Sequence, residues 1–203
     1  MLFGNICFLW FFFVNFYDSF AQKDNSKYID PTIGNEVPFL VPNHPMFHLP
    51  NQMIRMFPIK QDYISDQIEA FPFQRTSHRE AGILQMKVSI GSVSKSSWSK
   101  KINIDHDLDK FQPWLYATFL IDNTISLSFT PRKKTVLYKL DFPTESTKNI
   151  RIKGTGEMTV IANKDQSFSF EEKIKYTTKG TSPVTRIMTA YVYAIIIDNK
   201  NQS

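Results

Sequence analysis

The chain has 203 residues, of which 42% are hydrophobic, with a net charge of +5 and a single cysteine, Cys7. This length gives one domain with a sizeable core. The one tight basic cluster, Arg132 to Lys134, falls in a predicted turn, and no basic stripe is interleaved with aromatic residues, so the composition argues against a nucleic-acid-binding protein.

Residues 1 to 21 differ from the rest of the chain. Ile6 to Val14 is apolar and rich in Phe, and Ser19 and Ala21 place small residues at the −3 and −1 positions of a cleavage site. A membrane-spanning helix needs about 20 apolar residues, and Asn15 and Asp18 interrupt this run. The sequence therefore predicts a cleaved signal peptide and an exported protein, which is periplasmic, outer-membrane-associated or secreted and has no membrane contact after cleavage.

Cleavage at this point would remove the only cysteine, so the mature domain, residues 22 to 203, would have no disulfide and no thiol chemistry. The net charge would rise from +5 to +6 because Asp18 is the only charged side chain lost. A secreted domain without disulfides depends on its hydrophobic core for stability.

The next stretch, Lys23 to Ala81, is predicted to be mostly irregular. Seven of the eleven prolines lie between Pro31 and Pro72, and each one fixes its own φ and biases the preceding residue toward extended geometry. One or two helical turns are expected near Gln61 to Ala70, where apolar residues recur at rough helical spacing. Because a loop region this long usually has a function, we expect it to form one wall of a cleft if the domain binds sugar.

From Gly82 onward the pattern changes to short strands separated by turns. Ile125, Leu127 and Phe129 alternate with polar residues, which is typical of a strand with one buried face. The segment Trp114 to Ile121 is apolar on both faces, which predicts a strand covered on both sides. The predicted strands are 83–90, 98–104, 114–121, 125–130, 136–142, 150–153, 158–162, 168–174 and 186–197. Their number and spacing predict a mainly β fold, an antiparallel two-sheet β-sandwich.

Four stretches, taken together in their order and spacing, resemble a known family. They are YIDPTIGN (Tyr28 to Asn35), HLPNQMIRMFP (His48 to Pro58), INIDHDLDKFQPW (Ile102 to Trp114) and PWLYATFLIDNTISLSFTPRKKTVLYKLDFP (Pro113 to Pro143). The family is glycoside hydrolase family 92, the exo-acting α-mannosidases, and the resemblance is to its N-terminal β-sandwich domain. It implies a galactose-mutarotase-like supersandwich preceded by a long irregular N-terminal segment.

The chain departs from the family pattern at two places. Arg132 stands where the family often has Gly in a tight turn. Many members also have a Gly-Thr-Gly loop that reaches toward the sugar, whereas this chain has Gly34-Asn35-Glu36-Val37.

The resemblance also implies how the work of the enzyme is divided. Family members are inverting hydrolases with a bound calcium, and their catalytic acid, catalytic base and most of the calcium site lie in a C-terminal helical domain. We therefore expect no catalytic residue, metal ligand or cofactor in this chain, which alone should be inactive. Its expected partners are an α-mannoside or N-glycan and the missing C-terminal catalytic domain. A free-standing carbohydrate-binding β-sandwich module without catalysis is the alternative, and a purely structural sandwich is a third.

The candidate substrate-binding residues lie in the two N-terminal motifs: Gly34, Asn35, His48, Asn51, Gln52 and Arg55. Gly34 follows from the resemblance, and Asn35 is its neighbour. Amide and imidazole side chains pair well with sugar hydroxyls because they offer both donors and acceptors. If the loop lies over a cleft, these residues contact sugar; if it packs on the sandwich, they satisfy loop backbone. Trp98 and Trp114, at strand starts, are interpreted as core or domain-packing residues rather than sugar-stacking ones.

The densest polar cluster is Asp105-His106-Asp107-Leu108-Asp109. On a strand, only Asp105, Asp107 and Asp109 would share a face, and the glycine of an EF-hand-like calcium loop is missing. We favour a strand end that passes into a loop, with Asx turns satisfying backbone N–H groups, over a metal site.

Overall fold

The computed structural model describes Asn25, Tyr28 and residues 45–76, 82–177 and 184–198. The predicted signal peptide, Gly34 and Asn35 lie outside these residues. The chain divides into two units, Met1–Asp30 and Pro31–Ser203, and the architecture below belongs to the second. Among the described residues, no helix has the length and hydrophobicity that crossing a membrane requires.

The described residues form three antiparallel sheets. One has five strands in the order β1-β2-β3-β9, with β4 also paired to β2: β1 (Ile59–Lys60), β2 (Gln67–Arg75), β3 (Gly82–Ile90), β4 (Ile102–Asn103) and β9 (Lys148–Lys153). The second is the meander β5 (Lys110–Gln112), β6 (Leu115–Leu120), β7 (Ile125–Pro131) and β8 (Val136–Asp141). The third contains β10 (Glu157–Ala162), β11 (Ser167–Thr177) and β12 (Thr185–Ile195).

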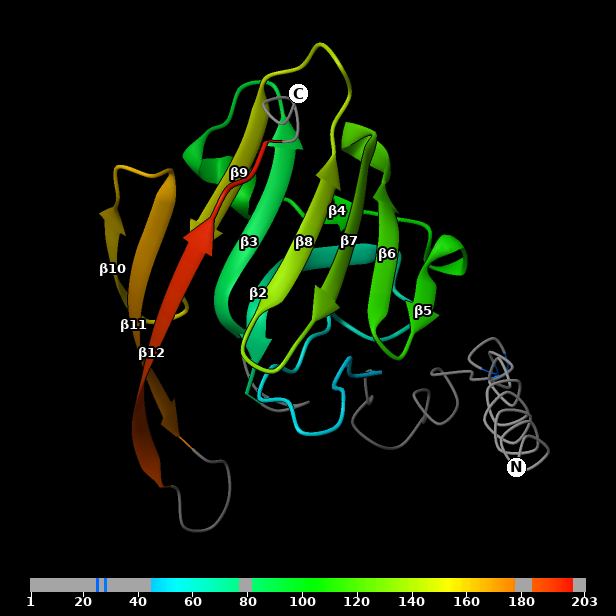
Figure 1. Cartoon of the computed structure of the whole chain (residues 1–203). Coiled ribbons are helices and arrows are strands. Elements are labelled where there is room, and N and C mark those ends of the chain that lie inside the picture. Colours follow the sequence, from blue (N-terminus) through cyan, green and yellow to red (C-terminus); the bar gives the residue numbers. More distant parts are fainter. Residues whose placement is uncertain (1–24, 26–27, 29–44, 77–81, 178–183, 199–203) are drawn as a thin grey trace, which may run out of the picture. The chain divides into compact units, whose positions relative to one another are not determined.

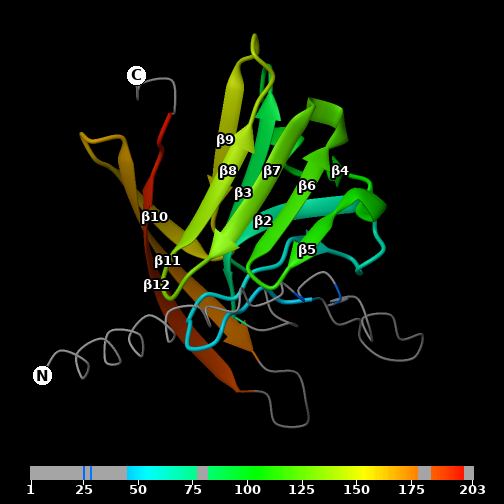
Figure 2. The same cartoon turned by 45° about the vertical axis from the view of Figure 1, so that its right-hand side comes forward.

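The five-stranded and four-stranded sheets form the sandwich. Figures 1 and 2 show β6, β7 and β8 lying over β2 and β3. One hydrophobic cluster lies between them, with Phe71 from β2, Val88 from β3, and Leu127 and Phe129 from β7 almost fully buried. The alternation along β7, buried at Ile125, Leu127 and Phe129, is the predicted one. The mainly β, antiparallel sandwich prediction is confirmed.

The third sheet packs one of its faces on the sandwich (Figure 1). Phe170 of β11 is buried with Ile83 and Leu84 of β3, and Ile152 of β9 packs against this cluster. Glu172 of β11, fully buried, is held by four hydrogen bonds. Its Oε2 accepts from the backbone N–H of Leu84 at 2.8 Å. Its Oε1 accepts from the turn before β10, where the donors are Thr155 N–H at 2.5 Å, the Thr155 hydroxyl at 2.8 Å and Gly156 N–H at 3.0 Å.

Gly156 is required at that turn by packing. A Cβ atom there would lie 2.0 Å from the carbonyl oxygen of Lys173, so any side chain would push the turn away from β11 and from the carboxylate that it caps.

Three sequence predictions need correction. The helical turn expected at Gln61 to Ala70 is absent from the described residues, because this stretch leads into β2, which pairs with β1, β3 and β4. The strand expected at 98–104 is only β4, since Lys95–Trp98 forms the 3-10 helix η2. Finally, β6 is covered on one face only: Tyr116 and Leu120 are buried, whereas Phe119 is 40% exposed.

Candidate functional site

The proline-rich loop of residues 45–58 is tied to the sandwich by backbone hydrogen bonds. Phe47 and Met56 pair as an isolated bridge, with N···O distances of 2.9 and 3.1 Å. Met53 N–H donates to the carbonyl of Lys133 in the β7–β8 turn, and Arg75 N–H of β2 donates to the carbonyl of Arg55, both at 2.7 Å. The buried Phe47 ring contacts the rings of Phe111, Tyr116 and Phe129. The loop is therefore a fixed layer of the fold.

Two of the four candidate sugar ligands in this loop stabilise the loop itself. Nε2 of His48 lies 2.8 Å from the carbonyl oxygen of Gln52. The side chain of Gln52 is buried and its Nε2 donates to the carbonyl of Ile54 at 2.7 Å. Asn51 is exposed, with a left-handed φ of 59° that Asn tolerates well, and Arg55 is half-buried. The exposed faces of His48 and Asn51, with Arg55, remain predicted sugar contacts.

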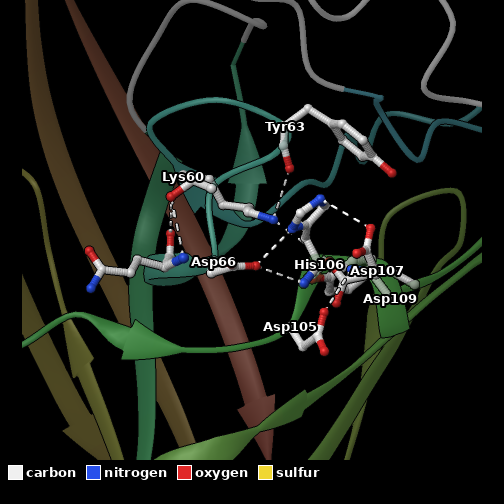
Figure 3. Close-up of polar contacts among 10 residues, drawn as sticks. Lys60, Tyr63, Asp66, Asp105, His106, Asp107 and Asp109 are labelled. Carbon is white, nitrogen blue, oxygen red and sulfur yellow. Dashed lines mark hydrogen bonds and ion pairs between the residues drawn. The ribbon is translucent and has the colours of Figure 1, made fainter.

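A buried ion pair lies beside this loop, between Lys60 of β1 and Asp109, the residue before β5 (Figure 3). Nζ of Lys60 is 3.7 Å from Oδ2 of Asp109, and each side chain is 1% exposed. Nζ also donates to the carbonyl of Tyr63 at 3.1 Å, and the Tyr116 hydroxyl donates to Oδ2 of Asp109 at 2.9 Å.

Burial governs the pKa values of this pair. It lowers the pKa of Lys60 and raises the pKa of Asp109, and the attraction between the two charges offsets part of both shifts. Burial also raises the pKa of Tyr116 well above its usual value, so this hydroxyl stays protonated and acts as a donor. A pair this enclosed cannot exchange protons with a substrate, and we interpret it as structural.

A second, more accessible set of contacts surrounds His106 in the 3-10 helix η3 (His106–Leu108) (Figure 3). Its Nδ1 lies 2.7 Å from Oδ1 of Asp66, which also accepts from the His106 backbone N–H at 3.0 Å. Nε2 lies 3.2 Å from Oδ1 of Asp107. The hydrogen bond to Asp66 raises the pKa of His106 and lowers the pKa of Asp66.

The Asx-turn interpretation of Asp105 is confirmed, because its Oδ1 accepts from the backbone N–H of Asp107 at 3.1 Å and caps η3. Asp105, Asp107 and Asp109 do not share a strand face, since the segment turns as a 3-10 helix instead of continuing as a strand. The carboxylates of Asp66 and Asp105 and the His106 ring do place ligand atoms within 4.8 Å of one another. Asp66 and His106 are already bonded to each other, and we assign no metal to them.

The sequence did not point to Asp66 or Lys60 as partners of this region. Asp66 is 40 residues from His106, and only the pairing of β2 with β4 brings the two segments together. The charged residues next to β1 and β2 gave no pattern from which this could be inferred.

Trp114 is 40% exposed, so the interpretation of this side chain as a core residue is wrong. The ring is available to pack on a neighbouring domain or on a sugar face. Trp98 is half-buried and lies among basic side chains.

Comparison with known proteins supplies a family. The family model described as the glycosyl hydrolase family 92 N-terminal domain matches residues 28–199. A solved structure, the family GH92 inverting mannosidase of Bacteroides thetaiotaomicron VPI-5482, is similar with a TM-score of 0.58 and 14% sequence identity. The alignment covers 86% of this chain and 30% of that one, so this chain spans less than a third of the enzyme's length. A search of curated proteins gave no match.

Proposed function

This chain belongs to the glycosyl hydrolase family 92 N-terminal domain family, and we propose that it is the non-catalytic β-sandwich of an α-mannosidase-like glycoside hydrolase. In this role it packs against a catalytic domain and forms one wall of the active site, while the two catalytic carboxylates and the calcium belong to that other domain. The protein is exported, as the composition of residues 1 to 21 predicts.

The observation that carries the proposal is a group of exposed apolar and aromatic side chains on the outer face of the third sheet, mostly on β12. The register places Ile161 of β10, Ser169 of β11 and Tyr193 of β12 side by side on the face opposite Phe168 and Phe170. Five apolar or aromatic side chains of this outer face, one on β10 and four on β12, are well exposed: Ile161 59%, Ile187 74%, Tyr191 76%, Tyr193 58% and Ile195 57%. Such a patch marks an interaction surface, and Tyr is a residue type enriched in interfaces.

A catalytic domain is the occupant that we propose for this outer face. The chain of the similar mannosidase is more than three times as long as its aligned part. The rest of that chain is therefore available to pack against the part that resembles this domain. Superposition on that structure tests the proposal: we expect the surface equivalent to the outer face to be covered by the rest of the enzyme. If that surface is open to solvent there, the docking proposal fails.

An activity assay tests the proposal that this domain is not catalytic by itself. Hydrolysis of an α-glycoside requires an acid and a base placed across the scissile bond, about 6.5–9.5 Å apart in an inverting enzyme. Among the described residues, the enclosed carboxylates of Asp109 and Glu172 are both used in structural hydrogen bonds. We expect no turnover of α-mannosides by the purified chain with calcium present, and sustained turnover would overturn the proposal.

The alternative, a free-standing carbohydrate-binding module, predicts a different result. His48, Asn51 and Arg55 would then bind mannose or mannobiose without any partner. Calorimetry at millimolar sugar separates the two functions, because a domain that only completes an active site should give no saturable heat alone.

A further inference from the structure

A cavity of about 180 Å³ is lined by residues of β3, by the segment around η2 (Lys95–Trp98) and the residues up to Ile102, by Asp122 and Asn123, and by Arg151 of β9. One water needs only about 10–15 Å³ of such space, so the cavity takes a group much larger than one water. Its walls are strongly basic. Four cationic side chains line it: Lys87, Lys100, Lys101 and Arg151.

The basic groups are crowded around one indole ring. Nζ of Lys87 lies 5.2 Å from the ring centroid of Trp98, and the guanidinium carbon of Arg151 and Nζ of Lys153 each lie 5.8 Å from it. Lys87 is only 4% exposed. Burial lowers its pKa, and repulsion from Arg151 and Lys153 lowers it further, with only partial relief from Glu69.

The one carboxylate in the lining does not neutralise this cluster. Asp122 accepts from Nδ2 of Asn103, at 3.1 Å to each oxygen, and pairs with Nζ of Lys100 at 3.5 Å. Its charge is therefore compensated on the Lys100 side of the cavity, which leaves Lys87 and Arg151 without a carboxylate of their own in the lining.

Two polar atoms of lining residues are buried and have no hydrogen-bond partner: Nε of Arg151 and Oγ of Ser89. The rest of the Arg151 guanidinium is anchored, since Nη1 donates to Oγ of Ser97 at 2.6 Å. Lys87 uses two of its three protons on the carbonyls of Trp98 and Lys100, at 2.5 and 2.7 Å. Buried donors without a partner are rare in folded proteins and call for an explanation.

We propose that this cavity binds a small tetrahedral oxyanion, a phosphate or sulfate group, either free or carried by a larger molecule. The planar guanidinium of Arg151 is the group best suited to hold an oxyanion through its N–H donors. Ser89 adds a hydroxyl donor, and Lys87 adds charge and a third proton. Water that fills the cavity would leave the repulsion between the basic side chains in place.

Calorimetry with the whole chain tests the proposal. Inorganic phosphate and inorganic sulfate are titrated separately into the protein, with sodium chloride holding the ionic strength constant. We expect saturable binding that weakens at least about tenfold in Arg151→Gln, the loss expected for one charge-assisted hydrogen bond of about 1.5–3 kcal/mol. Ser89→Ala should also weaken binding at least about tenfold, because a hydroxyl that donates to an oxyanion makes a charge-assisted hydrogen bond of about 1.5–3 kcal/mol.

The matched control is Lys139→Gln on β8, which removes an exposed positive charge of the sandwich outside the cavity. It should leave the affinity unchanged. Glucose 6-phosphate in place of inorganic phosphate separates the two sources: tighter binding assigns the site to a phosphate group on a larger molecule, and equal binding assigns it to the free anion. The proposal is overturned if neither inorganic anion gives saturable heat at millimolar concentration, or if Ser89→Ala, Arg151→Gln and Lys139→Gln all bind like the wild type.

Discussion

Replacement of Glu172 by Gln is the sharpest test of how the third sheet is held. The carboxylate is fully buried and accepts four hydrogen bonds, three of them from backbone N–H groups. Gln keeps the shape and one acceptor oxygen. If that oxygen takes the place of Oε1, it keeps the three bonds from Thr155 and Gly156, but the amide NH₂ then faces the N–H of Leu84, and two donors oppose each other.

The expected cost follows from this geometry. One buried hydrogen bond to a charged acceptor is lost and the N–H of Leu84 has no partner, which together cost about 1.5–3 kcal/mol. Glu172→Ala would remove all four bonds, and at about 1–3 kcal/mol each the loss approaches the whole stability of a domain, about 5–15 kcal/mol. Gln is therefore the informative variant.

Urea unfolding followed by tryptophan fluorescence measures this cost. With a slope of about 1–3 kcal/mol per M, a loss of 2 kcal/mol lowers the midpoint by roughly 1 M. Glu171→Gln is the matched control, because the adjacent side chain lies on the outer face and only pairs with Lys173 at 3.8 Å, half exposed. Such a pair contributes about 0–1 kcal/mol. Equal midpoints for the two variants would refute the assignment of Glu172 as the anchor of this sheet.

Two further predictions concern the cluster in Figure 3. Lys60→Met should cost about 3–5 kcal/mol, because it leaves the buried charge of Asp109 unpaired, and adding Asp109→Asn should restore part of that loss in urea unfolding; equal stabilities of the single and double variants would contradict this. His106 should titrate above 6.5 by NMR in the wild type, fall toward 6.5 in Asp66→Asn and change less in Asp107→Asn, since the Asp66 hydrogen bond is the main cause of the raised pKa. Because the folded-state pKa of His106 is raised, its contribution to stability is complete below pH 6.5 and is lost as the pH rises through the raised pKa. The folded-state pKa of Asp66 is lowered, so the contribution of Asp66 to stability is lost as the pH falls through the lowered pKa.

The strands of the sandwich were predictable from the sequence where one face of the strand is buried and the other is exposed to solvent. In β7 every second residue is apolar and buried, namely Ile125, Leu127 and Phe129, so the strand has one buried face. In β2 the same logic fails. Tyr63, Ile64 and Ile68 stand at rough helical spacing, which suggested a helix, but Ile68 belongs to β2 and is buried there, because β2 pairs with β1, β3 and β4 along its length.

The candidate site was predictable only within one stretch of chain. The cap formed by Asp105 involves a residue two positions away, so the sequence shows it. The partners of His106 and Asp109 are Asp66 and Lys60, which lie 40 and 49 positions earlier in the chain. Such contacts depend on sheet pairing, and no local pattern encodes them. The same holds for the basic cavity, which unites Lys87 with Arg151 only through the pairing of these two residues across β3 and β9.

The exposed outer face of the third sheet is better explained by binding than by incomplete folding. If the sheet needed a partner to fold, its anchoring groups would point outward. Instead the inner face contains Phe170 against β3 and the four hydrogen bonds of Glu172, all made within the chain. The outer face, with Ile187 and Tyr191 about three-quarters exposed, contributes little to this anchoring. Its exposed apolar side chains therefore have no role in holding the sheet on the sandwich, which is consistent with the proposed docking of a neighbouring domain.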